Sequence, residues 1–280
     1  MFLRRLLPLA ALALIAAPFA SEAKDWKKVV IATEGAYPPY NMHAPDGKLI
    51  GFEIDLAMDV CKRVNLECSF IAQDWDGIIP GLNAGKYDAV MSGMSITPKR
   101  LEVIDFTHAY TNSPTTFLVE KGSPLAKMAS PGRVSLDDKA GTDAAIAAIK
   151  PLLKGKIVGV QVSTIQSDLL NAFLKDTVEI RTYKTTEEHD LDLAAGRVDA
   201  ALASVSYFSS TLNKPGGDKF TMVGPLLTGG MLGKGSGIAL RKTDTDLKAL
   251  LDKGLLAAIK DGSVKALSMQ WFKADISAAE

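Results

Sequence analysis

Hydrophobic positions follow two different periods along the first half of the chain. Val29–Thr33 is a short apolar, β-branched run ahead of a Gly/Pro-containing loop, which is typical of a strand. From Phe52 to Val64 apolar residues recur every three or four positions, which predicts an amphipathic helix. The alternation continues with strands at Cys68–Ala72 and Asp88–Met91, and with helices beginning near Ile78 and after the capping pair Thr97-Pro98. Strands that alternate with helices predict α/β units with largely parallel sheets.

The second half repeats this alternation after a longer, more polar segment. Residues Lys127–Leu153 are expected to form a surface insertion in which only Ala144–Leu153 is helical. The pattern changes again around Thr221–Leu226, and the glycines between residues 229 and 237 predict a flexible stretch. The remaining predicted elements are strands Ile157–Val160, Val178–Tyr183, Ala200–Ala203 and Gly237–Arg241, and helices Glu187–Ala195 and from Thr164, Thr245 and Ser263.

A short internal repeat links the two halves. The segment AGKYDA at residues 84–89 recurs as AGRVDA at residues 195–200, an offset of 111 positions. Each copy lies between a helical segment and an apolar strand, and each strand runs into a Ser-containing loop. The matching context predicts two related α/β lobes.

The first 23 residues have a pattern of their own. Arg4 and Arg5 precede an apolar run from Leu6 to Ala20 and then small residues up to Ala23, an order typical of a secretory signal peptide. The 15-residue run is shorter than the roughly 20 residues that span a bilayer, and no Cys follows it to carry a lipid. We expect cleavage near Ala23, with Ala20 as the alternative, which leaves 257 of the 280 residues in an exported protein.

Charge and cysteine content exclude several classes of partner. The signal peptide removes two of 32 basic and one of 32 acidic residues, which leaves 30 and 31. Such a balanced chain has no overall field that would attract nucleic acid or a membrane surface. Cys61 and Cys68 are the sole cysteines, and a disulfide is favoured over a metal site or free thiols. The three histidines are scattered, so we expect no metal and no cofactor.

Six segments together resemble one known family. They are TEGAYPPY at 33–40, GFEIDLA at 51–57, WDGIIPGL at 75–82, MSITPKR at 94–100, GVQVST at 159–164 and WF at 271–272. In this order they resemble the periplasmic polar-amino-acid-binding proteins of the lysine/arginine/ornithine and histidine type, over essentially the whole mature chain. Within that family, the opine-binding proteins for octopine and nopaline are most similar, on the basis of Glu34, the insertion from Lys127, EEHDLDL at 187–193 and WFKAD at 271–275.

The resemblance implies a fold and a biological setting. It implies the type II periplasmic binding protein fold, with two α/β lobes, two hinge crossings and a ligand cleft between them. Lobe one would comprise residues 24–114 and 227–280, lobe two residues 115–226, with crossings near Asn112–Thr116 and Val223–Leu227. It also places the cysteine pair at the family's disulfide, and implies a periplasmic monomer that passes its ligand to the membrane permease of an ABC importer.

Arg100 is the predicted anchor for the ligand. It lies in the first turn of the helix that Thr97 caps, where a guanidinium and nearby N–H groups can grip a carboxylate. Spacing alone would favour a surface arginine, whereas the resemblance implies a clamp on the ligand's α-carboxylate. It further implies that the cradle is completed by Ser92, Gly93 and Ser95 from lobe one and by Ser163 and Thr164 from lobe two.

Three further residues are predicted to hold the ligand's side chain. Tyr37 and Trp75 match the family's stacking positions, and aromatic faces suit an aliphatic stem or a guanidinium. Glu34 follows the first strand, and its carboxylate would pair with a cationic head group. Without the resemblance, all three would be read as packing or solvated loop residues.

Ser204 departs from the family pattern. Ordinary members carry an Asp at this position that pairs with the ligand's α-ammonium, and loss of one partner of a buried charge pair costs about 2–5 kcal/mol. An opine carries a second carboxylate-bearing arm on its α-nitrogen, which a small hydroxyl would admit and to which it would donate a hydrogen bond. The sequence therefore predicts a binding protein for an arginine-derived opine, with free arginine, lysine, ornithine or histidine as the alternative.

Two other classes of function compete with binding and transport. The fold also hosts dehydratases, but the sequence has no nucleophile–base constellation, so we do not expect an enzyme. The dense match at ligand-contacting positions argues against an adhesive module. A role as a sensor coupled to a chemoreceptor stays open.

Overall fold

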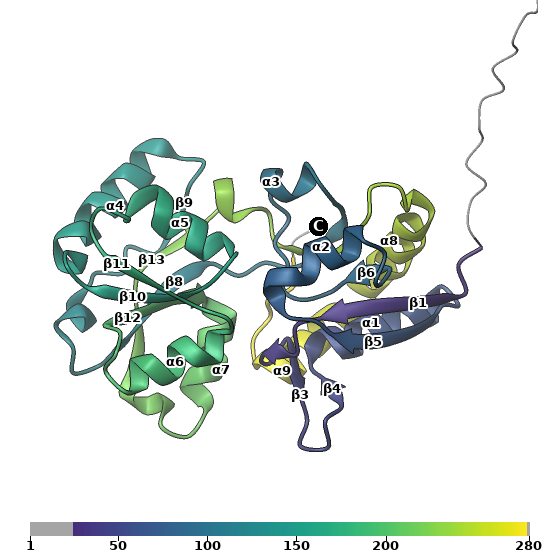
Figure 1. Cartoon of the computed structure of the whole chain (residues 1–280), viewed down its shortest axis with the longest axis horizontal. Helices are drawn as coiled ribbons and strands as arrows, with labels where there is room; N and C mark the ends of the chain where they lie inside the picture. The colour runs from purple at the N-terminus through teal and green to yellow at the C-terminus, as the bar shows by residue number, and fades with distance from the viewer. Residues whose placement is uncertain (1–24, 279–280) are drawn as a thin grey trace, which may run out of the picture.

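The chain folds into two α/β lobes that lie side by side, each built around one central sheet (Figure 1). The computed structural model describes residues 25–278, so the predicted signal peptide at 1–23 lies outside the described residues. The predicted two-lobed α/β class is confirmed. Within 25–278, no helix combines the length and the apolar composition that a membrane crossing needs.

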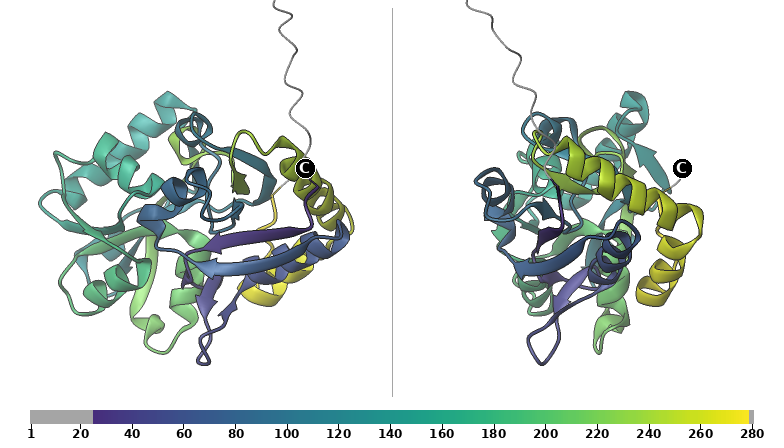
Figure 2. Two further views of the ribbon diagram at one scale, coloured as in Figure 1. Left: turned by 45° about the vertical axis from the view of Figure 1, so that its right-hand side comes forward. Right: turned by 90° about the vertical axis from the view of Figure 1, so that its right-hand side faces the viewer.

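Lobe one surrounds a five-stranded sheet with the order β5-β1-β6-β14-β7. β1 pairs in parallel with β5 and β6, whereas β14 is antiparallel to both of its neighbours. Helices α1, α8 and α9 pack together on one face, and α2 covers the other (Figure 2). The elements are β1 (Lys28–Thr33), β5 (Glu67–Ala72), β6 (Ala89–Val90), β7 (Asp105–Thr111), β14 (Ser236–Leu240), α1 (Phe52–Arg63), α2 (Ile78–Asn83), α3 (Pro98–Leu101), α8 (Thr245–Lys260) and α9 (Ser263–Phe272).

A small antiparallel sheet is attached to lobe one. It consists of β2 (Ala36–Tyr37), β3 (Asn41–His43) and β4 (Leu49–Ile50). The β3–β4 hairpin projects from the lobe (Figure 1). The predicted disulfide is confirmed, since Cys61 in the last turn of α1 is bonded to Cys68 in β5.

Lobe two surrounds a six-stranded sheet with the order β11-β10-β12-β8-β13-β9. Helices α4 and α5 cover one face and α6 and α7 the other. Its central strand β12 is buried at every position, as its run of alanines and leucine predicts. The elements are β8 (Thr115–Glu120), β9 (Arg133–Ser135), β10 (Ile157–Gln161), β11 (Glu179–Tyr183), β12 (Ala200–Ser204), β13 (Phe220–Thr228), α4 (Lys139–Leu153), α5 (Ile165–Phe173), α6 (Thr186–Ala194) and α7 (Val205–Asn213).

The aspartate of the internal repeat makes the same kind of hydrogen bond in both lobes. The Asp88 carboxylate accepts a hydrogen bond from the backbone N–H of Val30 in β1, at 3.0 Å. The Asp199 carboxylate accepts one from Ile157 in β10, at 2.9 Å. Each aspartate therefore fixes the start of a central strand, β6 or β12, against its parallel neighbour.

The chain passes between the sheets twice. β7 ends in the first sheet at Thr111 and β8 begins in the second at Thr115, so this crossing falls within the predicted Asn112–Thr116. The second prediction, Val223–Leu227, is wrong, because these residues belong to β13, which remains in the second sheet up to Thr228. The chain re-enters the first sheet with β14, after the Gly-rich residues 229–235, which contain a short 3₁₀ helix at Gly230–Leu232.

The break in pattern near residue 224 has a different cause. Gly224 and Pro225 lie where the pairing of β13 with β8 shifts register, so the sequence change marks a β-bulge and not an exit from the lobe. The predicted lobe boundary between residues 226 and 227 therefore falls inside a strand. The remaining boundaries stay predictions.

The polar segment after Lys127 is more ordered than the sequence predicts. α4 begins at Lys139, five residues before the predicted Ala144, and Arg133–Ser135 forms the edge strand β9. β9 pairs in parallel with the last residues of β13. Three residues are too few for an alternating pattern to be visible, so this strand could be assigned only from its partner.

Candidate ligand-binding site

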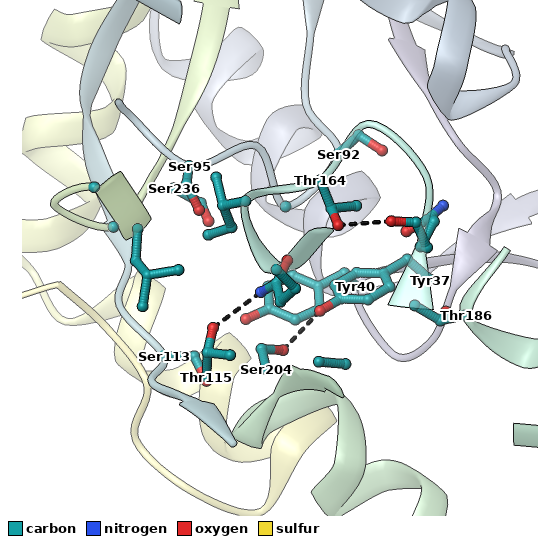
Figure 3. A pocket seen from close by; sticks show the side chains of 18 of the residues that line it. Tyr37, Tyr40, Ser92, Ser95, Ser113, Thr115, Thr164, Thr186, Ser204 and Ser236 are labelled. Carbon is teal, nitrogen blue, oxygen red and sulfur yellow. Dashed lines mark hydrogen bonds between the residues drawn. The ribbon is translucent and has the colours of Figure 1, made fainter. Parts of the chain in front are cut away.

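A cavity lies between the lobes and takes residues from both (Figure 3). Most of the predicted binding residues meet there, from segments that are far apart in the sequence. Nine of the ten line it, namely Glu34, Tyr37, Trp75, Ser92, Gly93, Ser95, Arg100, Thr164 and Ser204. The tenth, Ser163, is not among the lining residues.

Arg100 supplies a buried positive charge. Its side chain is in the first turn of α3, which Thr97 caps by accepting the Arg100 backbone N–H. The guanidinium donates to the Ser95 carbonyl at 3.0 Å and lies 5.2 Å from the centre of the Trp75 ring. Within residues 25–278 no carboxylate lies within ion-pairing distance of it, and burial lowers the pKa of Arg100 to about 10. A buried guanidinium without an ion-pair partner has the chemistry to bind an anion.

Glu34 supplies a buried negative charge. Its carboxylate accepts a hydrogen bond from the Gln161 amide at 2.5 Å, and the same amide group donates to the Lys184 carbonyl at 3.0 Å. Burial raises the pKa of Glu34 to about 7, although the hydrogen bond from Gln161 acts in the opposite direction. The carboxylate thus has a neutral partner where a cation would stabilise it better.

The two predicted aromatic walls line the cavity and also pack against the protein. The Tyr37 ring stacks on Tyr40 from its own lobe, at 5.2 Å, and on Tyr207 from lobe two, at 5.0 Å and 6°. Trp75 donates its indole N–H to the Ser163 carbonyl across the cleft, at 3.2 Å. Both residues therefore also join the lobes.

Ser204 is engaged by the protein itself. Its hydroxyl caps α7 by accepting the Tyr207 backbone N–H at 3.2 Å, and it lies 2.6 Å from the Tyr37 hydroxyl and 3.1 Å from that of Ser206. These contacts use the one donor and two acceptor positions of a hydroxyl. The position carries no charge, as the sequence showed, but the hydroxyl is not free to donate to a ligand as predicted.

Ser163 faces lobe one instead of the cavity. Its hydroxyl donates to the Asp76 carboxylate at 2.8 Å, and its carbonyl accepts the Trp75 indole N–H. Its backbone has a φ of +58°, a left-handed conformation that costs a residue with a Cβ about 1 kcal/mol. Thr164, which caps α5, is the neighbour that lines the cavity.

Sequence reasoning missed a group of neutral donors at the Ser204 end of the cavity. Ser113 and Thr115 lie beside Ser204 (Figure 3), and the Gln166 amide donates to the Thr115 hydroxyl at 3.0 Å. The available signal was the first crossing, because a segment that joins two lobes must run along the cleft between them. Gln161 was also missed, although it lies inside the GVQVST motif.

The fold and the interlobe cavity define a two-lobed binding protein of the extracellular solute-binding class. Residues 29–274 match the bacterial extracellular solute-binding proteins, family 3, and the chain belongs to this family. No group of three or more His, Cys, Asp or Glu side chains in the described part of the chain is arranged to hold a metal ion.

Individual relatives cover nearly the whole chain. An octopine-binding periplasmic protein from Rhizobium meliloti is 43% identical, over 96% of this chain and 97% of its own. An L-arginine-binding protein from Pseudomonas aeruginosa is 34% identical, over 98% of both chains. A periplasmic His/Glu/Gln/Arg/opine family-binding protein from Silicibacter pomeroyi, solved in complex with lysine, has a TM-score of 0.72 and 31% identity, over 90% of this chain and all of the other.

One structural neighbour bears on the enzyme alternative. It is an ancestral amino-acid-binding protein described as a precursor of cyclohexadienyl dehydratase, with a TM-score of 0.70 and 28% identity, over 88% of this chain and 95% of its own. The neighbour itself is a binding protein.

Proposed function

We propose that this protein is the periplasmic binding component of an ABC importer and captures an arginine-derived opine of the octopine or nopaline type by closure of its two lobes. The observation that carries the proposal is the pair of uncompensated charges in the cavity, the buried Arg100 guanidinium and the buried Glu34 carboxylate. An α-carboxylate would bind at Arg100 with the help of Ser92, Gly93, Ser95 and Thr164, and a guanidinium head at Glu34 beside Trp75. Tyr37 would line the cavity without stacking on the ligand, because its ring already stacks on Tyr40 and Tyr207.

The charge balance of the cavity favours octopine over arginine. Among the described lining residues, Arg100 and Glu34 are the charged ones, and their charges cancel when Glu34 is ionised. Arginine has a net charge of +1, and its α-ammonium would find no carboxylate at Ser204. Octopine carries two carboxylates against its amine and guanidinium, so its net charge is zero and its second carboxylate lies beside its own amine.

The second carboxylate would lie at the Ser204 end of the cavity. Ser113, Thr115 and Gln166 offer hydroxyl and amide donors there. Ser204 would contribute space, because its hydroxyl is already bonded to Tyr37 and caps α7. The similarity to an octopine-binding protein, at 43% identity, agrees with this assignment.

The setting follows from the family and from residues 1–23. We propose that these residues are a signal peptide cleaved near Ala23, and that the mature chain works in the periplasm as a monomer without enzymatic activity. A closed, liganded form would then dock on the membrane permease of the importer.

The alternative is a binding protein for free basic amino acids. The 34% identical arginine-binding relative and the lysine complex of a 31% identical neighbour favour it. Under this alternative, the ammonium would be held by neutral groups at the Ser204 end of the cavity.

A competition series with octopine, nopaline, arginine, lysine and histidine separates the two. We expect octopine or nopaline to bind most tightly to the unmodified protein. Ser204→Asp should shift the ratio of affinities towards arginine by about tenfold, because it pairs with an α-ammonium and repels a second carboxylate. Asp is also a good N-cap, so α7 should stay folded.

Ser204→Ala is the matched control. It removes the hydroxyl without adding charge, so it should lower stability by about 1 kcal/mol through the lost cap and leave the ratio of affinities unchanged. If the unmodified protein prefers free arginine by tenfold or more, the opine assignment fails and the basic-amino-acid alternative stands.

A further inference from the structure

A buried polar cluster lies directly behind the cavity, and its two central residues, Asn41 and Glu53, were not predicted from the sequence. Glu53 in α1 and Asn41 in β3 are both completely buried. Three donors converge on the Glu53 carboxylate. One oxygen accepts the Gly93 backbone N–H at 2.6 Å and the Tyr110 hydroxyl, and the other accepts the Asn41 amide at 2.7 Å.

Asn41 extends this cluster to the second loop at the cavity. Its carbonyl oxygen accepts the Gly35 backbone N–H at 2.7 Å, while its NH₂ group donates to Glu53. Gly35 follows Glu34, whose own N–H donates to the Ser92 hydroxyl at 2.9 Å. The loops that carry Glu34 and Gly93 are thus tied to one carboxylate.

Both loops have a constrained backbone next to residues that line the cavity. Gly35 and Gly93 have φ values of +75° and +59°, where a Cβ is unfavourable. A Cβ on Gly93 would also lie 3.2 Å from the Tyr37 ring, so the Gly93 backbone packs closely against that ring. A shift at either glycine would reach Glu34 or Tyr37, which line the cavity.

We infer that Asn41 and Glu53 are positioning residues that form a directional hydrogen-bond relay, Gly35 N–H to Asn41 to Glu53 to Gly93 N–H, which fixes two ligand-facing loops of lobe one. The inference rests on the proposed ligand site, since the relay matters for binding only if that cavity holds the ligand. Each hydrogen bond has a fixed direction, because the backbone N–H groups of Gly35 and Gly93 at the two ends of the relay can only donate.

The relay's polarity makes the test specific. In Glu53→Gln the new amide NH₂ faces the Asn41 NH₂, so two donors meet. If the Asn41 amide flips, its NH₂ faces the Gly35 N–H instead, and two donors meet there. In Asn41→Asp two carboxylates face each other. In the double variant Asn41→Asp/Glu53→Gln, the carboxylate introduced at position 41 accepts from both Gly35 and the amide NH₂ introduced at position 53. The carbonyl oxygen of that new amide still accepts from Gly93 and Tyr110. The double variant restores every hydrogen bond and keeps the net charge.

The experiment measures the Kd of octopine and arginine by calorimetry, with denaturant unfolding alongside. We expect each single variant to weaken the better ligand at least tenfold and the double variant to return within about threefold of the unmodified protein. Asp252→Asn is the matched control. Asp252 is a largely buried carboxylate in the same lobe, accepts the His108 backbone N–H at 2.7 Å and does not line the cavity. It should lower stability without changing Kd.

Each outcome decides the inference. Single variants that lose stability while they keep native Kd would show that the cluster is only structural. A double variant that does not recover would overturn the relay. If a single variant fails to fold, recovery of folding and affinity in the double variant still supports the relay, and failure in both overturns it.

A ligand-independent readout keeps this test separate from the proposed function. If neither probe binds the unmodified protein, the proposed function fails. The relay is then judged by amide hydrogen exchange at Gly35 and Gly93, which should be fast in both single variants and slow in the double variant.

Discussion

The Arg100 guanidinium offers the sharpest test of the binding site. Arg100→Ala removes the one buried cation that lines the described cavity, together with its hydrogen bond to the Ser95 carbonyl and its contact with Trp75. Loss of one partner of a buried charge pair costs about 2–5 kcal/mol, so a carboxylate ligand should bind about 30-fold to several thousand-fold more weakly.

The free energy of unfolding should change little, whereas loss of a structural arginine would lower it. Without ligand, Arg100 carries the desolvation cost of a buried charge and has no ion-pair partner within residues 25–278. The cap of α3 is unaffected, because Thr97 bonds the backbone N–H of residue 100. We therefore expect the ligand-free variant to unfold within about 1 kcal/mol of the unmodified protein.

Calorimetric titration measures the expected loss of affinity, and denaturant unfolding measures the small expected change in the free energy of unfolding. Arg241→Ala is the control, since Arg241 pairs with Asp88 and Asp244 in lobe one and does not line the cavity. It should lose stability and keep its affinity. Near-native affinity in Arg100→Ala, or an equal loss in Arg241→Ala, would remove Arg100 from the site.

Two further predictions concern the contacts between the lobes. Because burial raises the pKa of Glu34 to about 7, a guanidinium ligand must displace a proton below that pH. Affinity should therefore fall by up to about tenfold per pH unit below pH 7 and level off above it. Calorimetry in different buffers should show that ligand binding releases a proton at pH 6, and Glu34→Gln should abolish both effects. Ser163→Gly keeps the positive φ but loses the hydrogen bond to Asp76 across the cleft. The affinity for every ligand should fall by the same factor, roughly fivefold or about 1 kcal/mol, so that selectivity is unchanged. A ligand-specific loss in the competition series would place Ser163 at the ligand instead.

Local signals predicted most of the elements. Thr97-Pro98 identifies a helix start from adjacent residues alone and places Arg100 in the first turn of that helix, whereas the proposed role of Arg100 came from the family resemblance. The repeat at residues 84 and 195 was also visible in the sequence, although Val30 and Ile157, the strand partners of its aspartates, lie 58 and 42 positions away.

What the sequence could not supply depends on partners far along the chain. The contact between Gln161 and Glu34 joins residues 127 positions apart, and Ser204 meets Tyr37 over 167. β9 is a strand only because β13 lies beside it, and the bulge in β13 looks like a lobe boundary until its pairing is known. Such features follow from tertiary contacts and have no periodicity of their own.

The position of β14 sets an order of events during synthesis. It lies between β6 and β7 in the middle of the first sheet, although almost the whole of lobe two separates it from them in the chain. A growing chain can therefore complete the continuous second lobe while the first still lacks a central strand and the helices α8 and α9. Because domains fold as units, lobe one cannot complete its sheet until β14, at Ser236–Leu240, arrives. The cleft can exist only after that final strand is in place.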